Sequence, residues 1–113
     1  MRHRNRTDSN HKEISKIMRD LGWVVKDQHS AGGGIPDIRC RKHNREIEIE
    51  IKNPHGKNKV SLAQAEYIYH NDRAFIARCE ADCLDITYCE FKAREKSVSE
   101  CIKIIESYGK RTK

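Results

Sequence analysis

The sequence predicts an α/β fold, a single domain with a central mixed β-sheet flanked by helices. Residues 45–51 alternate strictly between polar and apolar side chains, which is typical of a half-buried strand. Apolar residues recur at helical spacing in 10–21 and in 97–109. The chain of 113 residues is long enough for one hydrophobic core but short for two. We therefore expect one domain over residues 1–113.

The elements are expected in the order helix, three strands, helix, one or two strands, helix. In the first helix, over 10–21, Asn10 can act as the N-cap. A strand over 23–28 leads to a loop with three consecutive glycines at 32–34. Strands over 37–42 and 45–52 follow, and the short turn between them predicts a hairpin.

The second half of the chain continues the alternation of helices and strands. Ser61 can cap a helix over 61–70, and the apolar run at 74–79 predicts a strand. A further strand is expected over 85–91. The last element is an amphipathic helix over 97–109, with Gly109 just past its end.

The formal net charge is +6, from 23 basic and 17 acidic residues. Basic residues gather at both ends, so we expect a flexible basic arm over 1–8 and a basic tail over 110–113. A third basic group follows the hairpin. Such a distribution favours a polyanionic partner, nucleic acid before membrane. Charge alone leaves simple solubility as an alternative.

No apolar run is long enough to span a bilayer, and no apolar segment follows the basic N-terminus as in a secretory signal. We therefore expect a cytoplasmic protein with no membrane partner. The five cysteines are an odd number, which favours free thiols. Cys79, Cys83 and Cys89 also permit a zinc site, although they lack a paired CxxC spacing.

The hairpin places candidate catalytic side chains close together at its open end. Glu50 and Lys52 lie two residues apart, on one face of a strand and about 6.6 Å from each other. Counted outward from the turn at Asn44, Asp37 lies almost opposite them. Two carboxylates beside a lysine suit a hard divalent cation and a phosphoryl group. A solvated strand face with cross-strand ion pairs is the alternative, but it does not explain the preceding glycine loop.

These residues resemble a known nuclease motif. "GIPD" at 34–37 and "EIK" at 50–52 are similar to the PD-(D/E)XK motif, and "LGW" at 21–23 and "QAEY" at 64–67 match its small branch. That branch includes the virus-type replication-repair nuclease (VRR-NUC) domain and the archaeal Holliday-junction resolvases. The resemblance covers residues 10–80 and implies a restriction-endonuclease-like fold.

The resemblance also implies site residues and a cofactor. Asp37, Glu50 and the backbone carbonyl of Ile51 would hold Mg²⁺ or Mn²⁺, and Lys52 would be the catalytic lysine. Glu13 would add a further carboxylate and Gln64 a catalytic polar side chain. From the residues alone, Glu13 and Gln64 are equally suited to capping boxes, with Asn10 and Ser61 respectively. Tyr67, also part of the family pattern, is expected to be a packing residue.

Further residues are candidates for contacts with DNA. Lysines after the hairpin and a loop histidine suit phosphate, although a mobile charged loop has the same composition. A serine in the glycine loop is a candidate because some resolvases carry a functional serine there. The full candidate set is Lys57, Lys59, Ser30, His55, Arg2, Arg4 and Arg6.

The sequence therefore predicts a Mg²⁺-dependent endodeoxyribonuclease that cuts branched DNA such as four-way junctions. Structure-selective cutting is favoured because so short a chain has little room for a separate recognition domain. A homodimer is expected, as in the resolvases, and phage origin fits small members of the family. Three alternatives remain open: a catalytically silent nucleic-acid-binding module, a restriction-like nuclease on duplex DNA, and a zinc-stapled interaction domain.

Overall fold

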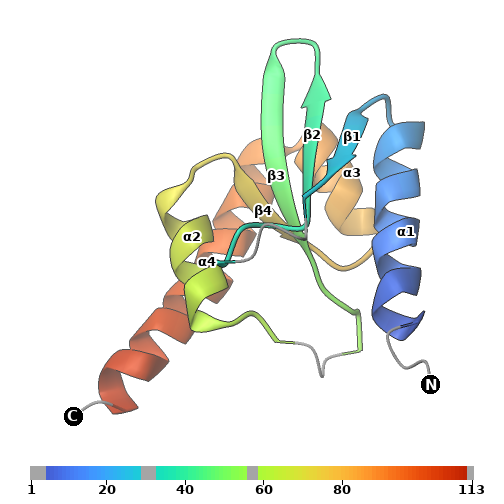
Figure 1. Ribbon diagram of the computed structural model, residues 1–113. Helices are drawn as coiled ribbons and strands as arrows, with labels where there is room; N and C mark the ends of the chain where they lie inside the picture. Colours follow the sequence, from blue (N-terminus) through green and yellow to red (C-terminus); the bar gives the residue numbers. More distant parts are fainter. Residues whose placement is uncertain (1–4, 29–32, 56–58, 112–113) are drawn as a thin grey trace.

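The computed structural model describes residues 5–28, 33–55 and 59–111. Within these ranges the chain is a single α/β domain with four helices and one four-stranded sheet (Figure 1). The elements are α1 (Asn5–Asp20), β1 (Val24–Asp27), β2 (Ile38–Lys42), β3 (Arg45–Ile51), α2 (Leu62–His70), β4 (Ala74–Ala77), α3 (Glu80–Tyr88) and α4 (Glu90–Arg111). The predicted fold class is confirmed at this level.

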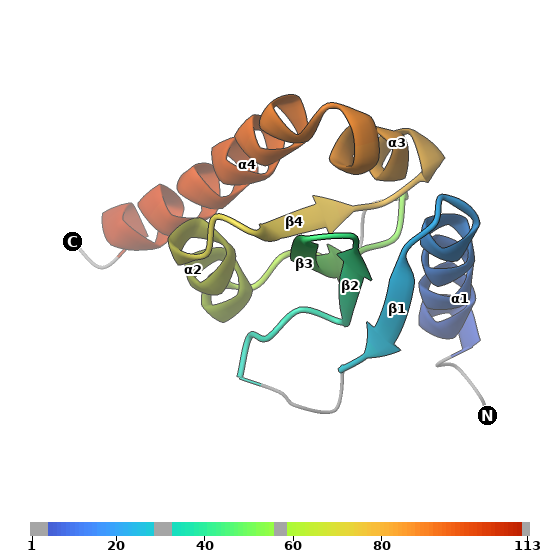
Figure 2. The ribbon, with the colours of Figure 1, turned by 90° about the horizontal axis from the view of Figure 1, so that it is seen from above.

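The sheet is mixed, with strand order β1-β2-β3-β4. β2 pairs antiparallel with both β1 and β3, whereas β4 pairs parallel with β3. The parallel pair needs a crossover, which α2 supplies. The β2–β3 hairpin turns at His43, whose φ of 55° is in the left-handed region. Figure 2 shows α1 and α2 at opposite ends of the sheet, with α3 and α4 running along β4.

Each face of the sheet carries its own hydrophobic cluster. Ile47, Ile49 and Ile51 lie on one face, where they pack with residues of α1 and α3. On the other face, residues of β4 pack against α2 and α4. The alternation of β3 therefore separates an isoleucine face in the core from a glutamate face directed toward the α2 side.

The expected strand over 85–91 is wrong, because this segment is helical. It contains the second half of α3 and the start of α4. Cys83 and Ile86 are both buried, at the i, i+3 spacing of a helix rather than the alternation of a strand. Asp82 stabilises the first turn of α3 by accepting a hydrogen bond from the Arg78 backbone N–H, at 2.7 Å. The short apolar run was compatible with both structures.

The helix ends also differ from the expectation. α1 begins at Asn5, so Asn10 lies inside the helix and does not cap it. Residues 5–8 of the expected flexible arm are helical, and residues 1–4 lie outside the described part. α4 runs on to Arg111 and contains Gly109, because a single glycine costs a helix only about 1 kcal/mol.

Gly34 makes a close approach between the loop before β2 and the first turn of α2. Its φ is +84°, and a Cβ there would lie 2.8 Å from the Ala63 carbonyl oxygen. A side chain would therefore meet both backbone strain and a backbone clash. This contact fixes the start of the segment that leads to Asp37.

We expect Gly34→Ala to lower the free energy of unfolding by about 2–3 kcal/mol, from left-handed strain plus overpacking. Gly33→Ala is the matched control, because φ is +63° but no atom lies within 4 Å of the added Cβ. It should cost only about 1 kcal/mol. Urea unfolding measures the free energy of unfolding of both variants. Equal losses would mean that the close approach of Gly34 to α2 does not contribute to stability.

Candidate active site

Asp37 occupies the place that the hairpin count predicts. Ile38 pairs with Ile49, so the residue before β2 faces the end of β3. The Ile51 backbone N–H donates a hydrogen bond to Asp37 Oδ2 at 2.8 Å. The Asp37 backbone carbonyl accepts another from the Gln28 backbone N–H, also at 2.8 Å. Asp37 is therefore tied to both neighbouring strands.

Glu50 and Lys52 lie together and buried on the glutamate face. Glu50 is 2% exposed, Lys52 is 7% exposed, and Lys52 Nζ lies 3.3 Å from Glu50 Oε2. The pKa of Glu50 is raised from 4.5 to about 7, chiefly by burial and then by the negative charge of Asp37, whereas Lys52 acts in the opposite direction. The structure thus brings together all three residues of the predicted constellation.

One oxygen of Glu50 is unsatisfied. Oε1 is buried, and no hydrogen-bond donor reaches it among the described residues. A buried carboxylate oxygen without a partner is costly and unusual in a folded protein. A second carboxylate, Asp37, stands close enough to raise the pKa of Glu50. A divalent cation would satisfy the oxygen and screen the two carboxylates, so the residues present fit the metal that the motif implies.

Lys52 is held through its backbone as well. Its N–H donates to the Ala77 carbonyl at 3.1 Å, and its carbonyl accepts from Asn10 Nδ2 at 2.7 Å. The sequence reasoning missed this role of Asn10 by placing the residue at the helix start. A signal was present, because Asn10 precedes the buried Ile14 and Met18 at spacings of four residues.

The Glu13 side chain is exposed on α1, and it makes no hydrogen bond or ion pair with Asp37, Glu50 or Lys52, all of which the structure describes. The capping-box reading of Glu13 is wrong, because Asn10 is not an N-cap. Within the described ranges, no three His, Cys, Asp or Glu side chains form a group able to hold a metal. A metal-binding role for Glu13 thus stays a prediction.

Gln64 caps α2. The Ser61 backbone N–H donates to Gln64 Oε1 at 2.9 Å, and the Gln64 backbone N–H donates to Ser61 Oγ at 3.1 Å. This reciprocal pair confirms the capping-box alternative. The catalytic role of Gln64 is untested and stays a prediction.

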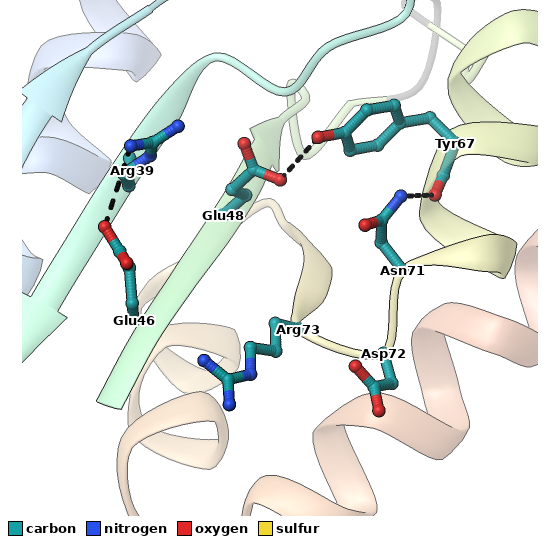
Figure 3. Close-up of a pocket in the computed structure, with 7 residues that line it drawn as sticks. All are labelled: Arg39, Glu46, Glu48, Tyr67, Asn71, Asp72 and Arg73. Carbon is teal, nitrogen blue, oxygen red and sulfur yellow. Dashed lines mark hydrogen bonds and ion pairs between the residues drawn. The ribbon is translucent and has the colours of Figure 1, made fainter. Parts of the chain in front are cut away.

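Glu48, to which the motif gives no role, is the centre of a hydrogen-bond network. Tyr67 Oη donates to its Oε1 at 2.8 Å, and Gln28 Nε2 donates to its Oε2 at 2.7 Å. Burial and the bond to Glu48 raise the pKa of Tyr67. Glu48 and Tyr67 line an open pocket of about 290 Å³, together with Arg39 and Asn71 (Figure 3). Tyr67 is thus more than a packing residue.

The expected DNA contacts are only partly described. His55 and Lys59 follow the hairpin in the chain and are exposed. Exposure is expected both for phosphate contacts and for a solvated charged loop. Several others lie outside the described residues: Ser30, Lys57, Arg2 and Arg4. Only the backbone of Arg6 is described, in α1.

The structure separates the three cysteines considered for zinc. All five cysteines are free. Cys79 and Cys89 cap opposite ends of α3, about 15 Å apart along its axis. Burial raises the pKa of Cys83, which lies between them, to about 12. Zinc–thiolate bonds of about 2.3 Å cannot join the three, so the zinc-stapled alternative loses its geometric basis.

Comparison with known proteins finds no matching family, no matching curated relative and no matching solved structure. A search of the described helices finds none both long enough and apolar enough to cross a membrane.

The buried carboxyl makes stability depend on pH. Because the folded pKa of Glu50 lies above its unfolded value, folding takes up a proton between pH 4.5 and about 7. The free energy of unfolding should therefore fall as pH rises through this window, by up to about 3 kcal/mol from this group. Glu50→Gln should match wild type near pH 4.5 and be more stable at pH 8.

Urea unfolding in EDTA at pH 4.5, 6 and 8 measures this difference. Glu46→Gln is the control, because Glu46 is exposed on the same strand and its substitution should leave the pH profile unchanged. A Glu50→Gln protein that is less stable than wild type at pH 8 would contradict the assignment. It would mean that pairing with Lys52 outweighs the cost of burial.

Proposed function

We propose that this chain is a Mg²⁺- or Mn²⁺-dependent endodeoxyribonuclease of the PD-(D/E)XK type, similar to VRR-NUC domains. The observation that carries the proposal is the unsatisfied, buried Glu50 Oε1 beside Asp37 and Lys52. An ordinary cross-strand ion pair lies at the surface, where water satisfies its carboxylate oxygens and the pairing stabilises the fold little. The resemblance of "GIPD" and "EIK" to the nuclease motif agrees with this reading.

The proposal gives each residue a role. Asp37 and Glu50 would supply anionic oxygens, and the Ile51 carbonyl, which the resemblance adds, would supply a neutral one. The bound cation would lower the pKa of a water molecule and offset negative charge on the phosphoryl group. Lys52 carries an ammonium donor that can orient the attacking water or bind a phosphoryl oxygen. Its burial strengthens that interaction, because little water screens it.

DNA is the proposed substrate because the chain is basic, with a net charge of +6. The resemblance to resolvases favours branched DNA over a specific duplex sequence. His55 and Lys59 follow the site in the chain and are exposed, as phosphate contacts must be. A cytoplasmic location is part of the same proposal.

Asp37→Asn, Glu50→Gln and Lys52→Ala should each reduce cleavage by at least about 100-fold, since each removes a charged group from the reacting centre. Asp37→Asn and Glu50→Gln should also weaken Mg²⁺ binding, because each removes an anionic ligand. Cleavage of labelled duplex, flap, fork and four-way-junction DNA with Mg²⁺, Mn²⁺ or EDTA measures the activity. Calorimetry measures metal binding.

Two controls make this test specific. Glu95→Gln removes a carboxylate from an exposed position on α4, away from the strand that carries the site, and should cleave normally. Lys52→Ala should still bind DNA, because most affinity comes from dispersed phosphate contacts. A wild-type protein that binds DNA but cleaves no substrate with either metal would leave the silent binding module as the better reading.

We also propose a homodimer that presents two active sites, since paired nicks in a junction require two sites related by a two-fold axis. β4 is excluded as the interface, because Ala74–Ala77 is buried within the subunit. The exposed apolar side chains Leu84, Tyr88 and Phe91 lie instead where α3 meets α4; Phe91 is 81% exposed. Tyr69, 43% exposed on α2, is the other candidate.

Light scattering at micromolar concentration should give the mass of a dimer. The double substitution Tyr88→Ser and Phe91→Ser should give a monomer, because it removes the largest exposed apolar area. Tyr69→Ser is the matched control and should remain dimeric. If Tyr69→Ser alone dissociates the dimer, the interface is on α2. A wild-type monomer that cuts flaps but not junctions would contradict the dimer and leave the nuclease assignment intact.

A further inference from the structure

We propose that the pocket beside Glu48 binds one unpaired nucleotide next to the scissile phosphate and prefers a base with an exocyclic amino group, such as adenine or cytosine, over thymine. This inference rests on the proposed nuclease function and names the part of the substrate that an adjacent site takes. Nothing in the motif assigns the pocket. It is formed by β2, β3, the end of α2 and the turn before β4 (Figure 3).

The pocket lies one step along β3 from the active site. Glu48 and Glu50 are on the same face of β3, about 6.6 Å apart along the strand. This step is comparable with one nucleotide of an extended nucleic-acid strand. Gln28 links the two places, because its backbone donates to Asp37 and its side chain donates to Glu48. A strand with a phosphate at Glu50 therefore brings its neighbouring nucleotide to Glu48.

The pocket offers acceptors on its wall. Both oxygens of Glu48 are oriented by donors from Tyr67 and Gln28, yet each keeps a further lone pair. Asn71 Nδ2 donates to the Tyr67 carbonyl at 2.9 Å, and Figure 3 shows its amide oxygen turned away from that carbonyl, toward the pocket. An acceptor-rich wall complements the amino groups of adenine and cytosine. Thymine presents a carbonyl there, which these groups repel.

Two arginines of the pocket can bind the phosphates of a nucleic-acid strand. Arg73 is exposed, and no hydrogen bond or ion pair engages its guanidinium among the described residues. Arg39 makes only a long contact of 3.6 Å with Glu46, both side chains being half exposed, and such a pair is weak. A guanidinium is well suited to bind phosphate oxygens. Acceptors and two guanidinium groups in one pocket together match a nucleotide.

The nucleotide must be unpaired. Bases in a duplex already use their amino groups in pairing, whereas unpaired bases offer this edge to protein side chains. With a volume of about 290 Å³, the pocket is large enough for one base. The pocket therefore favours flaps, forks and open junction centres as substrates.

The test is binding of the whole protein, in EDTA and at fixed salt, to labelled flap DNA whose single-stranded flap is all dC, all dA or all dT. Fluorescence anisotropy should show about tenfold tighter binding of dC and dA flaps than of dT flaps, as expected of a charge-assisted hydrogen bond to a base. Glu48→Gln should reduce this preference to about twofold or less.

Matched variants separate the contributions. Tyr67→Phe removes the hydrogen bond from Tyr67 to Glu48 but keeps the carboxylate, so it should keep the base preference and control for disturbance of the pocket. Arg73→Gln should weaken binding of all three flaps several-fold more than Arg19→Gln, which removes an equal charge from an exposed position on α1.

Equal affinity of wild type for the three flaps would overturn the inference, as would a preference that survives Glu48→Gln. Mg²⁺-dependent cleavage of the same DNA distinguishes the two proposals. Cleavage without base preference leaves the nuclease function intact and removes only the nucleotide pocket. A protein that neither cleaves nor binds any of these flaps overturns both.

Discussion

The hydrogen bond from the Ile51 N–H to Asp37 Oδ2 is the contact on which the arrangement of the site depends. It joins the segment before β2 to the end of β3, at the open end of the hairpin. The register of this hairpin is specified by the isoleucine face, because a slip of one residue would turn Ile47 and Ile49 out of the core. The core thereby determines which carboxylate faces Asp37, and Glu50 is that residue.

Burial of Glu50 opposes folding, and the surrounding structure compensates for it. The carboxylate lies 2% exposed on the strand that supplies three isoleucines to the core. Lys52 offsets part of the desolvation cost of Glu50 through their ion pair. The backbone of Lys52 is held by hydrogen bonds with Ala77 and Asn10. A proton or a cation can offset the remainder. A structure that keeps so costly a group is typical of functional sites, where charge is positioned before the substrate arrives.

The sequence predicted those features that depend on local pattern. Strict alternation predicted which residues of β3 share a face. Counting residues outward from the hairpin turn predicted that Asp37 lies opposite Glu50. The segment 85–91 was mispredicted because a short apolar run fits both periods, and burial of Ile86 against the core decides for a helix. Contacts between distant segments have no local signal. The bond from Asn10 to the Lys52 carbonyl joins residues 42 positions apart, and the network of Glu48 requires three separate elements.

The three glutamates of β3 show why position outweighs residue type. Glu46 is exposed, and its one ion pair is long. Glu48, two residues on, is held by Tyr67 and Gln28 and keeps lone pairs for a ligand. Glu50 is buried, with its pKa raised to about 7. Solvent access decreases along one strand face from the hairpin turn to its open end, so identical side chains become a solvated charge, an oriented acceptor and a candidate metal ligand. Under the proposed function, a nucleic-acid strand lying along this face would meet the last two in adjacent positions, so that recognition and cleavage would share one strand of the sheet.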